Sequence, residues 1–60
     1  MEKMRVIVAD DETIIRLDIK EMLTEAGHNV VAEAADGEEA GKLAIEITPD
    51  LVIMDVKMPK

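Results

Sequence analysis

Apolar residues along this chain follow two alternating spacings. Three short runs rich in β-branched residues stand at RVIVA (5–9), NVVAEAA (29–35) and DLVIMD (50–55). The first and third are continuous, which is typical of strands buried on both faces of a parallel sheet. The second contains more alanine, as expected of a strand nearer an edge. The pattern therefore predicts three strands, at about these residues.

The segment between the first two runs shows helical spacing over about residues 13–26. Five apolar residues fall on one face of that helix, and Gly27 stands where a left-handed C-cap belongs. The predicted face consists of Ile15, Ile19, Met22, Leu23 and Ala26. Ile14 and Leu17 are also apolar, but they lie off this face.

A second helix is predicted over about residues 37–47. Asp36 and Glu39 have the spacing of a capping box at its start, and Pro49 prevents its continuation. Gly41, inside the helix, costs about 1 kcal/mol relative to alanine, and the sequence gives no local reason for it. The predicted buried face consists of Ala40, Leu43, Ala44 and Ile47.

The order of elements, β-α-β-α-β, predicts one α/β domain over residues 1–60. Such an alternation gives a parallel sheet with right-handed crossovers, and ligands bind beyond the carboxyl ends of its strands. Asp10 and Asp11 follow the first strand, and Asp55 ends the third. We therefore expect three carboxylates to meet at the binding edge of the sheet.

Three neighbouring carboxylates repel each other unless a cation lies between them. Mg²⁺ suits such a set of oxygen ligands, and it neutralises charge on a phosphoryl group attacked by a carboxylate. A purely structural interpretation stays open, in which Asp10 and Asp11 cap the first helix and Asp55 is a turn residue. In that interpretation Lys57 is a solvated lysine.

Composition narrows the classes of function further. Seven basic residues against fourteen acidic ones give a net charge of -7, which argues against nucleic-acid binding within this chain. Cysteine is absent, so no disulfide or thiolate zinc site can form, and the single His28 cannot build a metal site alone. No apolar run approaches the 18 residues of a membrane span, so we expect a soluble cytoplasmic protein.

Two motifs carry a resemblance to a known family. VIVADDE (6–12) and DLVIMDVKMP (50–59) resemble the receiver domain of two-component response regulators, and the likeness extends through EMLTEAG (21–27) and AADGEEA (34–40). The segment IIRLDIKEML (14–23) is similar to regulators that carry an ANTAR-type RNA-binding antitermination module. No such module lies within these residues.

The resemblance implies the first half of a flavodoxin-like receiver fold, with strand order 2-1-3. It implies that Asp55 accepts a phosphoryl group from a histidine kinase. Mg²⁺ would be held by Asp10, Asp11, Asp55 and the backbone carbonyl of Lys57. The chain would then be a signalling domain rather than an enzyme.

Two further elements of the family site, a hydroxyl residue on strand 4 and a lysine ending strand 5, have no counterpart here. We therefore also expect an alternative, a truncated half-fold that self-associates through its third strand and has little phosphotransfer activity. A metal-dependent phosphohydrolase is disfavoured, because such enzymes usually place a second aspartate two residues after the nucleophile. In this sequence Lys57 occupies that position.

Overall fold

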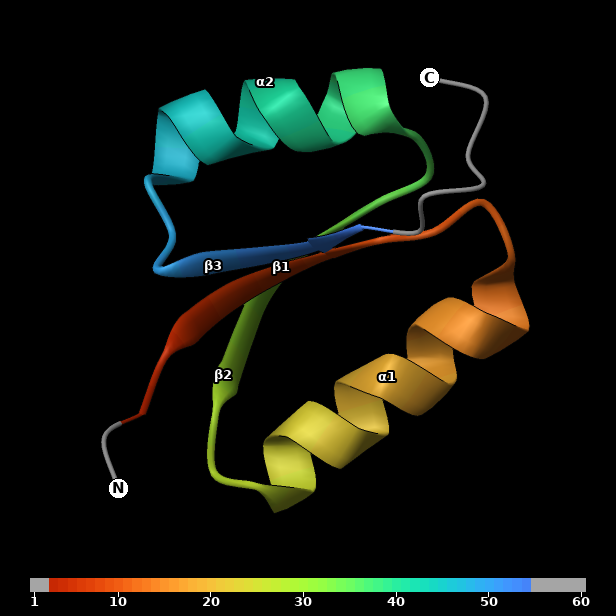
Figure 1. The fold of residues 1–60 in the computed structure, drawn as a ribbon, viewed down its shortest axis with the longest axis vertical. Helices are drawn as coiled ribbons and strands as arrows, with labels where there is room; N and C mark the ends of the chain where they lie inside the picture. The colour runs from red at the N-terminus through yellow and green to blue at the C-terminus, as the bar shows by residue number, and fades with distance from the viewer. Residues whose placement is uncertain (1–2, 55–60) are drawn as a thin grey trace.

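The structure, a computed structural model, describes residues 3–54. Its elements alternate strictly between strand and helix (Figure 1). In chain order they are β1 (Arg5–Ala9), α1 (Thr13–Glu25), β2 (Asn29–Ala34), α2 (Gly37–Ile47) and β3 (Leu51–Met54). The three strands form one parallel sheet in the order β2-β1-β3, which confirms the predicted topology.

The two helices cover opposite faces of the sheet (Figure 1). Helix α2 contacts all three strands, whereas α1 contacts β1 and β2 but not β3. The central strand is enclosed from both sides as a result. Its residues Val6, Ile7 and Val8 are the largest fully buried side chains among the described residues.

Small residues bring α2 close to the sheet. Ala9 and Ala34, from neighbouring strands, form a buried cluster with Ala40 of the helix, and Leu43 and Val52 pack against it. Ala40 has no exposed surface. The four residues of the predicted buried face of α2 are all buried or half-buried: Ala40, Leu43, Ala44 and Ile47.

The apolar face predicted for α1 is covered only in part. Ile19 and Leu23 are half-buried, but Ile15 and Met22 are 41% and 57% exposed, and Ala26 is exposed as well. The prediction was wrong for these three residues because α1 spans two strands instead of three. The helix therefore has too little sheet surface to cover its whole apolar face.

Both helix ends that the sequence predicted have the expected local structure. Gly27 has a φ of 93° after α1; its N–H donates to Thr24 O, and the His28 N–H donates to Leu23 O, the two bonds of a Schellman motif. At the start of α2, Asp36 Oδ1 accepts from the Glu39 N–H at 2.8 Å. Glu39 Oε1 accepts from the Ala35 N–H, also at 2.8 Å, one residue before the N-cap N–H that a capping box uses.

The end of α2 is held by a residue from the beginning of the chain. Thr48 follows the helix with a left-handed φ of 50°, an unusual conformation for a β-branched residue. The Arg5 guanidinium donates to Ile47 O at 3.1 Å and to Thr48 O at 3.3 Å. The Arg5 N–H also donates to Asp50 Oδ2, and the Asp50 N–H donates to Arg5 O. Arg5 thus joins β1 to the α2–β3 connection.

Candidate functional site

A buried carboxylate lies directly after β1. Asp10 is 2% exposed, and its N–H donates to Ala34 O of β2 at 3.1 Å. Its Oδ1 accepts a hydrogen bond from the Glu12 N–H at 2.8 Å. Within residues 3–54 this is the one hydrogen bond that the carboxylate accepts.

Neither of the two neighbouring aspartates is the N-cap of α1. That position belongs to Glu12, whose side chain makes no capping hydrogen bond. Asp10 binds the N–H of the N-cap residue instead, and Asp11 is exposed. Capping of the loop before α1 therefore explains the hydrogen bond of one Asp10 oxygen, and it gives Asp11 no role.

A cluster of charged side chains lies beside this loop. Arg16 of α1 donates from Nη1 to Asp10 O at 2.7 Å and from Nε to Glu33 Oε1 at 3.0 Å. Lys20, one turn further along the helix, donates to Glu33 Oε2 at 2.6 Å. Glu33 thus joins β2 to two basic residues of α1, and Arg16 continues the connection to the backbone of Asp10.

These contacts affect the acidity of Glu33. The hydrogen bond from Lys20 and the bonds and charge of Arg16 hold its pKa below the ordinary value of 4.5, while desolvation opposes them. The Glu33 side chain is 37% exposed, so solvent screens much of this interaction.

Sequence reasoning missed this cluster, although two signals for it exist. Arg16 and Lys20 are four residues apart and therefore share one face of α1. Glu33 interrupts an otherwise apolar strand, which indicates a partner on that side of the sheet. Neither signal identifies the carbonyl of Asp10 as an acceptor.

Two of the predicted site residues, Asp55 and Lys57, lie outside the described residues. The described register of β1 and β3 ends at the Ala9–Met54 pair. Within residues 3–54, no three His, Asp or Glu side chains gather into a possible metal site. The part of the site that is described therefore consists of Asp10 and Asp11, whose carboxylate oxygens are hard donors of the kind that Mg²⁺ prefers.

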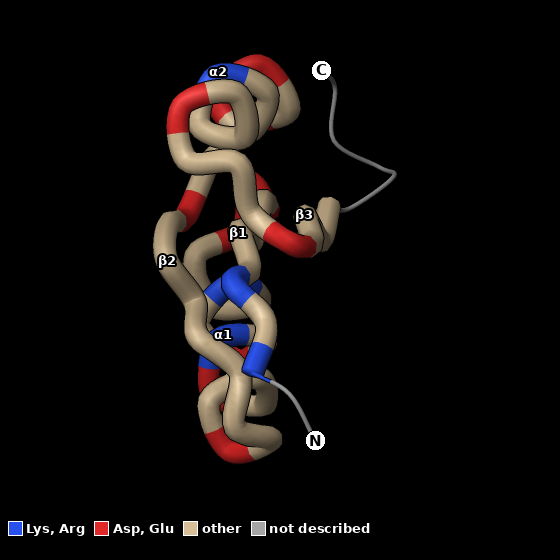
Figure 2. Tube along the Cα trace, turned by 90° about the vertical axis from the view of Figure 1, so that its left-hand side faces the viewer, with Lys and Arg blue, Asp and Glu red and all other residues tan. Residues whose placement is uncertain are grey.

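Acidic residues are not confined to this loop. Figure 2 shows them on both helices and on the connections between elements, with the basic residues interspersed. The negative charge of the chain is thus spread over its surface. It favours cations in general and does not by itself mark a site.

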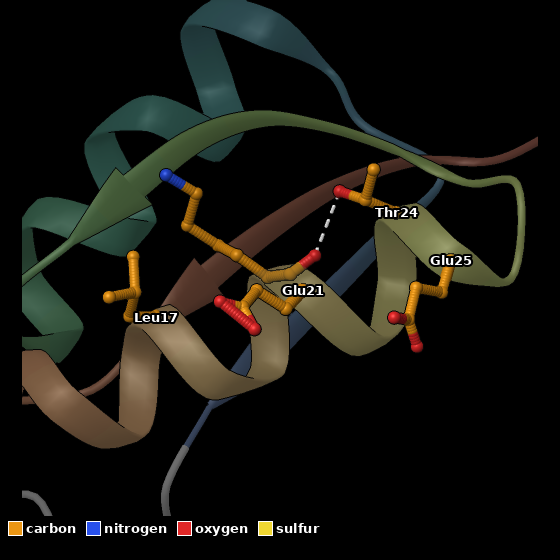
Figure 3. Close-up of a pocket in the computed structure, with 5 residues that line it drawn as sticks. Leu17, Glu21, Thr24 and Glu25 are labelled. Carbon is orange, nitrogen blue, oxygen red and sulfur yellow. Dashed lines mark hydrogen bonds between the residues drawn. The ribbon is translucent and has the colours of Figure 1, made fainter.

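A groove of about 350 Å³ runs along the second half of α1 (Figure 3). Leu17, Lys20, Glu21, Thr24 and Glu25 line it, and the Thr24 hydroxyl donates to Lys20 O at 2.8 Å. All five residues belong to one helix, and none of them is a predicted site residue. The groove is therefore separate from the acidic loop.

The described structure is that of a small doubly wound α/β domain with a carboxylate buried at the carboxyl end of its central strand. The sequence profile of the response regulator receiver domain matches residues 6–60. This chain belongs to the response regulator receiver domain family.

Individual relatives agree with this assignment. The transcriptional regulatory protein PdtaR of Mycobacterium tuberculosis is 59% identical over 56 residues, which are 93% of this chain and 27% of that protein. The chemotaxis protein CheY of Thermotoga maritima is 41% identical over 56 residues, 93% of this chain and 47% of that protein. The chain thus spans between about a quarter and a half of the length of these relatives.

Solved structures show the same fold. The signal receiver domain of NarL from Mycobacterium tuberculosis superposes with a TM-score of 0.91 at 40% identity, covering 98% of this chain and 48% of that one. The receiver domain of AraT from Geobacillus stearothermophilus gives a TM-score of 0.82 at 45% identity, covering 97% of this chain and 46% of that one.

None of the helices in residues 3–54 is long and apolar enough to cross a membrane.

Proposed function

We propose that the protein acts in the cytoplasm as a phosphoacceptor, in which Asp55 receives a phosphoryl group from a histidine kinase. One observation carries the proposal. Strands β1 and β3 are paired in register up to Ala9 and Met54, and each of these residues is followed in the sequence by an aspartate. Membership of the receiver family supports the same assignment.

In the proposed reaction, a carboxylate oxygen of Asp55 attacks phosphorus, and the bond from phosphorus to the imidazole nitrogen of the kinase breaks. The electron pair of that bond leaves with the imidazole. Mg²⁺, when bound, would supply positive charge that offsets the charge of the phosphoryl group. Asp10, Asp11, Asp55 and the backbone carbonyl of Lys57 would hold the ion.

The described residues contribute to this site before any cation binds. Asp10 keeps its carboxylate beside the end of β1, because its Oδ1 is hydrogen-bonded to Glu12 and its N–H to β2. Preorganised ligands of this kind avoid the cost of rearrangement on binding. Asp11, exposed and next in sequence, supplies a ligand that can adjust to the ion.

The metal site is tested by following backbone amide shifts during a Mg²⁺ titration. We expect weak binding, with the largest shifts at Asp10 and Asp11. Asp55→Ala should abolish the effect. The control is Asp18→Ala, which removes an exposed carboxylate in the middle of α1 and should leave the titration unchanged. Equal Mg²⁺ affinity in Asp55→Ala and the unmodified chain would contradict the proposal.

The transfer itself is tested with acetyl phosphate and mass spectrometry. These 60 residues include neither the hydroxyl nor the lysine with which the family contacts the phosphoryl oxygens. Loss of one preorganised donor typically costs about 10²–10³ in rate, so we expect slow or undetectable labelling of the 60 residues alone. Rapid stoichiometric labelling would show that Asp55 needs neither donor.

A second candidate function is self-association through β3. This strand is an edge of the described sheet, and its Leu51 and Met54 are 40% and 45% exposed. An apolar edge with unpaired backbone groups is a template for another strand. Two copies pairing β3 to β3 across a two-fold axis would form a continuous six-stranded sheet.

Light scattering distinguishes this candidate. A compact, folded monomer at all accessible concentrations would exclude it. If a dimer forms, Leu51→Lys should weaken it, because a lysine on the edge opposes pairing. Ile45→Lys, on the exposed side of α2, is the matched control. Ile53→Pro should give an unfolded monomer, since proline removes a backbone donor in the middle of the strand.

One of the relatives is named a transcriptional regulatory protein. It supports a role of the complete protein in controlling gene expression. The likeness of residues 14–23 to regulators with an ANTAR-type module makes such an output a proposal, and no part of it lies within these 60 residues.

A further inference from the structure

Arg16 has an unusual set of partners for a helix-surface arginine. One end of its guanidinium meets a backbone carbonyl, that of Asp10, at 2.7 Å, and the other meets the Glu33 carboxylate at 3.0 Å. The side chain is only 17% exposed. A surface ion pair alone would not require the first contact.

The carbonyl that Arg16 binds belongs to the residue whose carboxylate is the buried half of the candidate cation site. Asp10 is held at three points: its N–H by β2, its carbonyl by Arg16, and its Oδ1 by the Glu12 N–H. Glu12 in turn is the N-cap residue of α1, and its carbonyl accepts from the Arg16 N–H at 3.0 Å. Arg16 thus holds both the loop that leaves β1 and the helix that follows it.

Glu33 determines where the guanidinium lies. Glu33 of β2 pairs with Val8 of β1, and Val8 lies two residues before Asp10. The second oxygen of Glu33 is bonded to Lys20, so the carboxylate is anchored from two sides. Arg16 can bind the Asp10 carbonyl and Glu33 together because its planar group presents donors in a fixed fork.

We propose that Arg16 is a positioning residue for the cation site, and that Glu33 of β2 orients it. This rests on the proposed function, because it assumes that the Asp10 carboxylate is a Mg²⁺ ligand. Residues that orient metal ligands without touching the ion commonly change metal affinity by about 10–100-fold when they are replaced. An arginine that acted only through its charge would have the opposite effect, since a positive group near the site repels Mg²⁺.

The two effects separate in a Mg²⁺ titration of two variants, followed by amide shifts. Arg16→Lys keeps the charge but cannot span both acceptors, and Arg16→Gln removes the charge as well. Positioning predicts that both variants bind Mg²⁺ about tenfold more weakly. Wild-type affinity in Arg16→Lys, or tighter binding in Arg16→Gln, would overturn the proposal.

Two further variants test the role of Glu33. Glu33→Gln removes the charged partner of Arg16 and should weaken Mg²⁺ binding in the same direction, by less than the Arg16 variants. Glu21→Gln is the matched control, because it removes an exposed carboxylate of α1 that is not among the described partners of Arg16. Equal losses in Glu33→Gln and Glu21→Gln would show that Glu33 acts only through its charge and would overturn its orienting role.

Hydrogen exchange of the metal-free chain keeps this test independent of the proposed function. The Glu12 amide is protected by Asp10 Oδ1, so Arg16→Lys should speed its exchange. Arg5→Lys is the control, because it disturbs an arginine with two backbone carbonyl bonds at the other end of β1. If the unmodified chain fails to bind Mg²⁺, the proposed site is wrong. Faster Glu12 exchange confined to Arg16→Lys would still support positioning, and unchanged exchange would overturn it.

Discussion

The two crossovers of this fold are held to the sheet by different interactions. Helix α2 packs closely, through a fully buried Ala40 against alanines of β1 and β2. Helix α1 has no buried residue and is joined to β2 by Arg16, Lys20 and Glu33. Close packing of small residues permits little change, whereas exposed ion pairs contribute little stability but can be rearranged. The candidate site is connected to the α1 face, through the hydrogen bond from Arg16 to the Asp10 carbonyl.

The largest expected effect lies on the α2 face. Ala40→Leu adds three carbon atoms at a position without exposed surface, and we expect it to destabilise the chain by about 3 kcal/mol. Chemical denaturation followed by circular dichroism measures the change. A loss below about 1 kcal/mol would mean that α2 can move away from the sheet, and the contrast between the two faces would disappear.

A matched pair of leucines compares the helices directly. Leu43→Ala removes a side chain that packs against the alanine cluster, and it should cost about 2 kcal/mol. Leu17→Ala makes the same change on α1, where the side chain is 52% exposed, and it should cost less than about 0.5 kcal/mol. Equal losses of unfolding free energy would contradict the difference between the two helices.

A third prediction concerns two of the three glycines, Gly41 inside α2 and Gly27 after α1. Gly41 lies inside α2, and within residues 3–54 no atom from outside the helix backbone lies within 4 Å of the place that an alanine methyl group would take. Gly41→Ala should therefore stabilise the chain by about 1 kcal/mol. Gly27 has a φ of 93°. Gly27→Ala should therefore lower the stability of the chain by about 1 kcal/mol, because it forces alanine into the left-handed region. Thermal unfolding of both variants measures the signs.

The smallest effect is the pH dependence of the α1 face. Because the folded-state pKa of Glu33 is lowered, its ion pairs stabilise the fold above the ordinary value of 4.5. This stabilisation is lost as the pH falls through the folded-state pKa. After screening it amounts to about 0.5 kcal/mol. Urea denaturation at neutral pH and at pH 3 should therefore show a smaller pH dependence in Glu33→Gln than in the unmodified chain. An unchanged difference would assign the acid sensitivity to other carboxylates.

The topology and the ends of both helices could be predicted from the sequence because they depend on local chemistry. Continuous apolar runs define β1 and β3, and Asp36 caps the start of α2. Gly27 follows α1 in the left-handed conformation that was predicted. The predicted burial of Ile15 and Met22 failed because helical periodicity gives the direction of a side chain, but not the width of sheet that lies beneath it.

Only part of the candidate site could be derived from the sequence. The position of Asp10 directly after β1 follows from the sequence, but its burial was not predicted. The contact from Arg16 to the Asp10 carbonyl was not predictable, because a backbone acceptor leaves no mark in the sequence. The roles of Asp55 and Lys57 stay predictions.

The bonds made by Arg5 have a consequence for synthesis on the ribosome. They connect residue 5 to residues 47, 48 and 50. These bonds cannot form until the ribosome has added residue 50. Translation from the end of β2 to the end of β3 takes roughly 1–4 s at usual rates of elongation. During that interval one edge of the strand that becomes central is open. Unpaired strand edges of this kind favour aggregation, so pairing of β3 with β1 removes that risk.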